Sequence, residues 1–70
     1  IMIGIIDEFN GEFGYILCND ELIEFSKDDI SNEQELNVGD TVEFRLEVKF
    51  YDIKIARHIN KVEGVVDEEF

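Results

Sequence analysis

Hydrophobic and polar residues alternate along most of this chain with the two-residue period of a β-strand, and short turn sequences separate the alternating runs. The pattern is clearest in residues 41–50, where one face is hydrophobic and the other is charged. The hydrophobic face of that run consists of Val42, Phe44, Leu46 and Val48. Asn10-Gly11 is a strong hairpin signal because both residues accept positive φ. Short β-branched and aromatic runs without a long helical period predict a small barrel or sandwich.

We expect five strands and one short helical turn. The strands are predicted over about residues 2–9, 12–18, 21–26, 41–50 and 53–62. Ser26 to Ile30 is typical of a single helical turn with Ser26 as its N-cap. In the fifth strand Ile53, Ile55 and Ile59 are the expected core residues, and Ala56 allows close packing. The chain is therefore predicted to contain one domain over residues 1–62, followed by an acidic C-terminal tail over residues 63–70.

The second strand carries the candidate binding residues. Alternation places Phe13, Tyr15 and Leu17 on one face and Gly14, Ile16 and Cys18 on the other. Because aliphatic side chains fill the interior of a small closed barrel, the aromatic pair is predicted to point outward. Exposed neighbouring rings indicate a binding surface. The alternative is that the rings cover a second hydrophobic side of the barrel, or a dimer contact, and bind no ligand.

Two segments carry a family resemblance. The first is Phe9-Asn10-Gly11-Glu12-Phe13-Gly14-Tyr15-Ile16, and the second is Leu22-Ile23-Glu24-Phe25-Ser26. Together they resemble the two ribonucleoprotein-type motifs of the cold-shock domain, which read Phe-Asn, Gly-Phe-Gly-Phe-Ile and, on the next strand, His-Phe-Ser. The resemblance extends over roughly residues 2–62 and implies an all-β, five-stranded antiparallel barrel of the OB type.

In the cold-shock family the matching rings stack on single-stranded bases. The resemblance therefore implies that Phe13 and Tyr15 stack on bases and that Phe9 supports them. It also implies that Phe25 extends the aromatic surface, although plain alternation would turn Phe25 inward, and that Gly14 keeps the surface flat enough for a base to approach. Lys27 and Arg57 are the cations expected to reach the rim of this surface and contact phosphate.

The charge of the chain opposes this function. Asp7, Glu8 and Glu24 stand where the family usually has Lys, Trp and His, and the 18 acidic residues against 6 basic ones give a net charge of −12. Stacking contributes about 1–3 kcal/mol per base, whereas a carboxylate about 4 Å from a phosphate costs about 1 kcal/mol in water. The leading hypothesis is therefore weak binding of single-stranded RNA or DNA. The alternative is an acidic protein-interaction module, a nucleic-acid mimic or inhibitor, that keeps the fold and binds a basic protein.

Other classes of function find little support. With one histidine, His58, and one cysteine, Cys18, the chain offers neither a zinc site nor an activated nucleophile, so we expect no enzyme, metal or cofactor. A single cysteine favours a reducing compartment, and we expect the cytoplasm. No run of apolar residues is long enough for a membrane span, so no membrane partner is expected. The acidic tail ending in Phe70 is expected to be a solubilising, disordered segment; the alternative is a partner-binding tail, since it also resembles the acidic, Phe-ended tail of bacterial single-stranded DNA-binding proteins.

Overall fold

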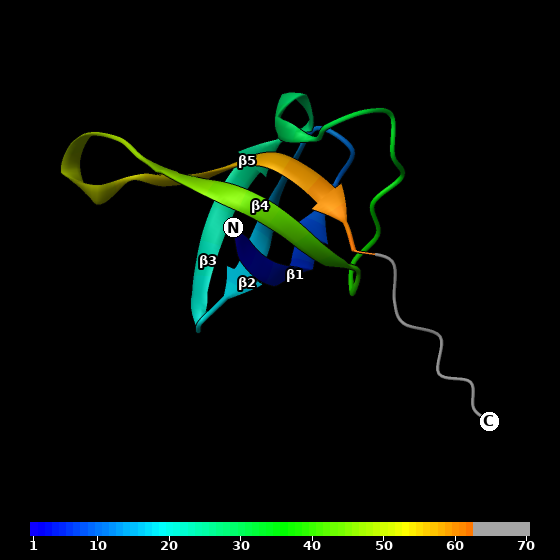
Figure 1. Ribbon diagram of the computed structural model, residues 1–70, viewed down its shortest axis with the longest axis horizontal. Helices are drawn as coiled ribbons and strands as arrows, with labels where there is room; N and C mark the ends of the chain where they lie inside the picture. Colours follow the sequence, from blue (N-terminus) through cyan, green and yellow to red (C-terminus); the bar gives the residue numbers. More distant parts are fainter. Residues whose placement is uncertain (63–70) are drawn as a thin grey trace.

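The computed structural model describes residues 1–62, which form a closed barrel with the strand order β1-β2-β3-β5-β4 (Figure 1). The strands are β1 Met2–Phe9, β2 Phe13–Cys18, β3 Glu21–Ser26, β4 Thr41–Val48 and β5 Lys54–Lys61. Short 3-10 helices, η1 Lys27–Asp29 and η2 Phe50–Asp52, follow β3 and β4. The predicted all-β, five-stranded barrel is confirmed. One detail differs, since β3 and β5 pair in parallel and close the barrel, whereas the sequence predicted only antiparallel pairs.

Local hydrogen bonds and backbone conformation stabilise the predicted turns at Asn10-Gly11 and at Ser26. The side-chain oxygen of Asn10 accepts hydrogen bonds from the backbone N–H groups of Glu12 and Phe13, both at 2.9 Å. Gly11 adopts a φ of 97°, which favours glycine. Ser26 is the N-cap of η1, as predicted, and its backbone N–H donates to the carboxylate of Asp29 at 2.9 Å. These contacts fix the two ends of the β2–β3 hairpin that carries the candidate site.

The core lies along the inward faces of the strands. Ile6, Ile16 and Ile23 are paired across β1, β2 and β3 and form a buried row. The remaining buried hydrophobic residues are Cys18, Phe25, Leu36, Val42, Phe44, Ala56 and Ile59. The predicted inward orientation of Gly14, Ile16 and Cys18 is confirmed.

The prediction for β5 needs correction. Ala56 and Ile59 are fully buried, but Ile53 is half exposed and Ile55 is only partly buried. The buried positions are three residues apart because the pairing with β4 shifts register at a bulge where His58 has a φ of 55°. Ile53 fails to reach the core because the β4–β5 hairpin projects from the barrel (Figure 1), which also leaves Val48 exposed.

Candidate binding face

The outward face of β2 presents the two predicted rings. Phe13 is 66% exposed and Tyr15 is 41% exposed, which confirms their predicted orientation. Tyr15 pairs with Glu8 on β1 and with Glu24 on β3, and both glutamates are exposed. Directly paired residues in antiparallel strands have Cβ atoms about 4.5–5.5 Å apart. The ring of Tyr15 therefore stands between two carboxylates on the same face of the sheet.

Beside the rings lies an open groove of about 630 Å³, which we call the aromatic groove. It is lined by Glu8, Phe9, Asn10, Phe13, Gly14, Tyr15, Glu24, Phe25, Ser26, Asp29, Ile55 and Arg57. Phe9 is partly buried and contacts Phe25, with ring centroids 5.3 Å apart and planes inclined by 35°. Phe9 therefore packs against a core ring at the edge of the groove, and its expected support of Phe13 and Tyr15 stays a prediction.

Phe25 does not belong to the exposed surface, so the expectation taken from the resemblance is wrong on this point. Its side chain is 3% exposed and belongs to the core, as plain alternation with Ile23 requires. Phe25 reaches the aromatic groove only from beneath, as part of its floor. The exposed aromatic surface is therefore limited to Phe13 and Tyr15, with Phe9 at its edge.

Gly14 also has a different role from the one expected. It pairs with Phe25 and is buried, so it faces the core and not an approaching base. A Cβ at this position would overlap the backbone oxygen of Glu8 and would lie 2.7 Å from Cζ of Phe25. The absence of a side chain at Gly14 therefore makes room for the ring of Phe25.

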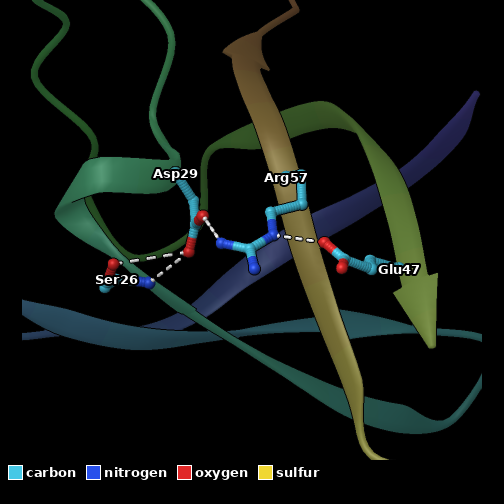
Figure 2. A network of polar contacts seen from close by, with 4 residues as sticks. All are labelled: Ser26, Asp29, Glu47 and Arg57. Carbon is cyan, nitrogen blue, oxygen red and sulfur yellow. Dashed lines mark hydrogen bonds and ion pairs between the residues drawn. The ribbon is translucent and has the colours of Figure 1, made fainter. Parts of the chain in front are cut away.

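Arg57 lies on the wall of the groove and is held by two carboxylates (Figure 2). Its Nη1 donates to Oδ1 of Asp29 at 2.6 Å, and its Nε donates to Oε1 of Glu47 at 2.7 Å. The hydrogen bond from Arg57 lowers the pKa of Glu47, and the bonds to Glu47 and Asp29 raise the pKa of Arg57. Because Asp29 also accepts the N–H of Ser26, the network ties η1 to β4 and β5 and carries one net negative charge.

Lys27, the second expected phosphate contact, is also paired. Its Nζ lies 3.4 Å from the carboxylate of Glu12, and both side chains are more than half exposed. An exposed pair of this kind contributes about 0–1 kcal/mol and exchanges partners easily. A phosphate bound at Lys27 or at Arg57 would lie close to these carboxylates, and their charge would oppose it.

No sequence pattern indicates the ion-pair network of Arg57 with Asp29 and Glu47. Asp29 lies in the helical turn predicted over Ser26 to Ile30, for which no ion pair was expected, and the register that brings Glu47 beside Arg57 depends on the bulge at His58. Asp29 is only 7% exposed, and within residues 1–62 it is the one charged residue that is buried. Alternation alone gives no signal for a contact set by a shifted register.

The described residues show no other candidate chemistry. Within residues 1–62 no group of His, Cys, Asp and Glu side chains is arranged to hold a metal ion. The thiol of Cys18 is buried and donates to the carbonyl oxygen of Ile3 at 3.3 Å. The same part of the chain contains no helix with the length and hydrophobicity of a membrane span. The predicted tail, residues 63–70, lies outside the described residues.

The protein is a closed five-stranded β-barrel. The outer surface of β1, β2 and β3 carries an aromatic groove that is bordered by carboxylates. Neither a scan against models of known protein families nor a search of curated proteins finds a match to this chain.

Proposed function

We propose that this protein is a non-catalytic binding module that binds single-stranded RNA or DNA weakly through its aromatic groove. The observation that supports the proposal is the exposure of Phe13 and Tyr15 at alternate positions of one strand, beside a groove with aromatic side chains at its edge and floor. Successive bases stack on rings arranged in this way with little dependence on sequence. On this proposal Phe13 and Tyr15 stack on bases, Phe9 supports them, and Phe25 forms the floor.

The energetics favour a low affinity. Two stacked bases contribute about 2–6 kcal/mol in total, and Glu8 and Glu24 each oppose a nearby phosphate by about 1 kcal/mol. The bound strand would place its bases on the rings and direct its phosphates away from these two carboxylates. Because few phosphates would be neutralised, the affinity should fall less steeply with salt than is usual for nucleic-acid-binding proteins.

The test is an NMR titration at low salt with heptathymidine and with a pyrimidine RNA of the same length. We expect chemical-shift changes at Phe13 and Tyr15, and about tenfold weaker binding in Phe13→Ala and in Tyr15→Ala, equivalent to about 1.4 kcal/mol. Phe50→Ala is the matched control, since Phe50 is an exposed ring on the β4–β5 hairpin that does not line the aromatic groove. Absence of any shift at millimolar oligonucleotide would end the proposal.

A second candidate function is an acidic protein-interaction module that binds a basic protein, as a nucleic-acid mimic or inhibitor. The observation that favours it is the pairing of Lys27 and Arg57 with carboxylates while Tyr15 stands between Glu8 and Glu24. A ring flanked by carboxylates suits a cationic side chain, which gains from the π-face and from the charges together. Under this candidate, hexa-arginine shifts the Tyr15 resonances, salt reverses the shift, and heptathymidine has no effect.

For the location of the protein we propose the cytoplasm. The support is compositional: Cys18 is the only cysteine of the chain and its thiol is buried, so the fold uses no disulfide within the chain.

A further inference from the structure

A row of exposed aliphatic residues crosses the outer face of β1, β2 and β3 next to Tyr15. Ile5 pairs with Leu17, and Leu17 pairs with Leu22, so the three side chains are direct neighbours across the sheet. Ile3 continues the row along β1. We call this set, Ile3, Ile5, Leu17 and Leu22, the aliphatic stripe; its members are between 41% and 58% exposed.

The stripe does not contribute to the core. Gly4, Ile6 and Ile16 alternate with it along the same strands and take the buried positions. A strand with one buried face normally carries polar residues on the other. Isolated exposed aliphatic residues are common, but neighbouring ones on adjacent strands mark an interaction surface.

The charges around the stripe indicate which partner it suits. Glu8 and Glu24 border it at the Tyr15 end, and Glu43 on β4 pairs with Ile3 at the other end. The net charge of the chain is −12. A second copy placed on the stripe would bring like-charged borders together, whereas a cationic partner gains from both the apolar centre and the acidic border.

We infer that the aliphatic stripe is the docking surface for a cationic amphipathic segment of another protein. Apolar side chains of that segment cover Ile5, Leu17 and Leu22, and its Lys or Arg side chains pair with the carboxylates of Glu8, Glu24 and Glu43. The inference rests on the second candidate function and gives it an apolar surface beside the aromatic groove, with which it shares the carboxylates of Glu8 and Glu24. It is independent of nucleic-acid binding.

The test uses a synthetic peptide of leucine and lysine, spaced to form an amphipathic helix, and a peptide of the same length and charge with serine in place of leucine. We expect the leucine peptide to shift the methyl resonances of the stripe and to bind at least tenfold more tightly than the serine peptide. Leu17→Thr and Leu22→Thr should each weaken its binding about tenfold. Val38→Thr, a matched control at an exposed valine outside the stripe, should leave binding within about twofold of wild type.

Each contrary outcome points to a different failure. Equal affinity for the two peptides would show that charge alone attracts them, and it would refute the inference that the aliphatic stripe is a docking surface. Shifts confined to Phe13 and Tyr15 would overturn the stripe but keep the acidic module, with the aromatic groove as its site. No binding of either peptide would overturn both. A concentration-dependent dimer that Leu17→Thr abolishes would replace the inferred partner with a second copy of the chain. Circular dichroism of each variant checks that the barrel is intact.

Discussion

Substitution of Gly14 by alanine tests how the floor of the aromatic groove is built. A Cβ at this position would overlap the backbone oxygen of Glu8, and it would lie 2.7 Å and 2.9 Å from two ring atoms of Phe25. The ring can tilt, but the backbone oxygen moves only if β1 and β2 separate. Alanine at position 14 is therefore expected to destabilise the protein.

The expected cost can be set against the stability of the domain. Overpacking a filled core costs about 1–3 kcal/mol, and we expect the upper end of that range because one of the overlapping atoms belongs to the backbone. A domain of this size has a free energy of unfolding of only a few kcal/mol. At about 4–8 °C per kcal/mol, the Tm should fall by about 12–24 °C.

Urea unfolding followed by circular dichroism measures the change in free energy. The control is Gly11→Ala, where no atom lies within 4 Å of the added Cβ and only the positive φ of 97° opposes it, at about 1–2 kcal/mol. Phe25→Leu in the Gly14→Ala background should recover about 1 kcal/mol, because it removes the two ring atoms but not the backbone contact. A loss no greater than that of Gly11→Ala would refute the assigned role of Gly14.

Three further predictions concern the site, the core and the pH dependence. Glu8→Gln combined with Glu24→Gln should tighten heptathymidine binding about thirtyfold at low salt, since each carboxylate opposes a phosphate by about 1 kcal/mol and the two together by about 2 kcal/mol; unchanged affinity would mean that the strand does not pass Tyr15. Ile59→Ala should cost about 2–5 kcal/mol in urea unfolding and Ile53→Ala less than about 0.5 kcal/mol; similar losses would contradict the exposed position of Ile53 on the projecting hairpin. The hydrogen bond with the guanidinium of Arg57 lowers the pKa of Glu47 below its ordinary value of 4.5. Its stabilising effect is therefore complete above about pH 4.5, the pKa of the unfolded state, and is lost as the pH falls through the lower pKa of the folded state. The difference in stability between wild type and Glu47→Gln should accordingly shrink on acidification, and a constant difference would contradict the pairing.

The sequence predicted the barrel and the inside and outside of β2 because both follow from local rules. Hairpin turns and two-residue alternation determine where strands begin and which side chains face the core. Alternation alone predicts that Phe13 and Tyr15 point outward and that Ile16 and Cys18 point inward. Alternation was also right for Phe25, where the family resemblance had favoured exposure.

What the sequence could not supply depends on contacts between distant segments. The bulge at His58 shifts β5 relative to β4, which turns Ile55 away from the core and brings Glu47 beside Arg57. The parallel pairing of β3 with β5 places Ile55 beside Glu24 on the groove side. No short-range pattern encodes a register shift of this kind, so the ion-pair network and the shape of the groove emerged only from the structure.

The arrangement of charge is what separates the two candidate functions. A surface that binds single strands needs rings together with cations that are free to meet phosphate. The outer face of β2 presents two exposed rings, but Lys27 and Arg57 are already paired with carboxylates and Tyr15 lies between two more. Stacking on Phe13 and Tyr15 must therefore supply nearly all of any affinity for nucleic acid. A cationic protein segment would gain from the same rings and carboxylates at once, so the comparison of heptathymidine with hexa-arginine on Tyr15 is the measurement that decides between the two.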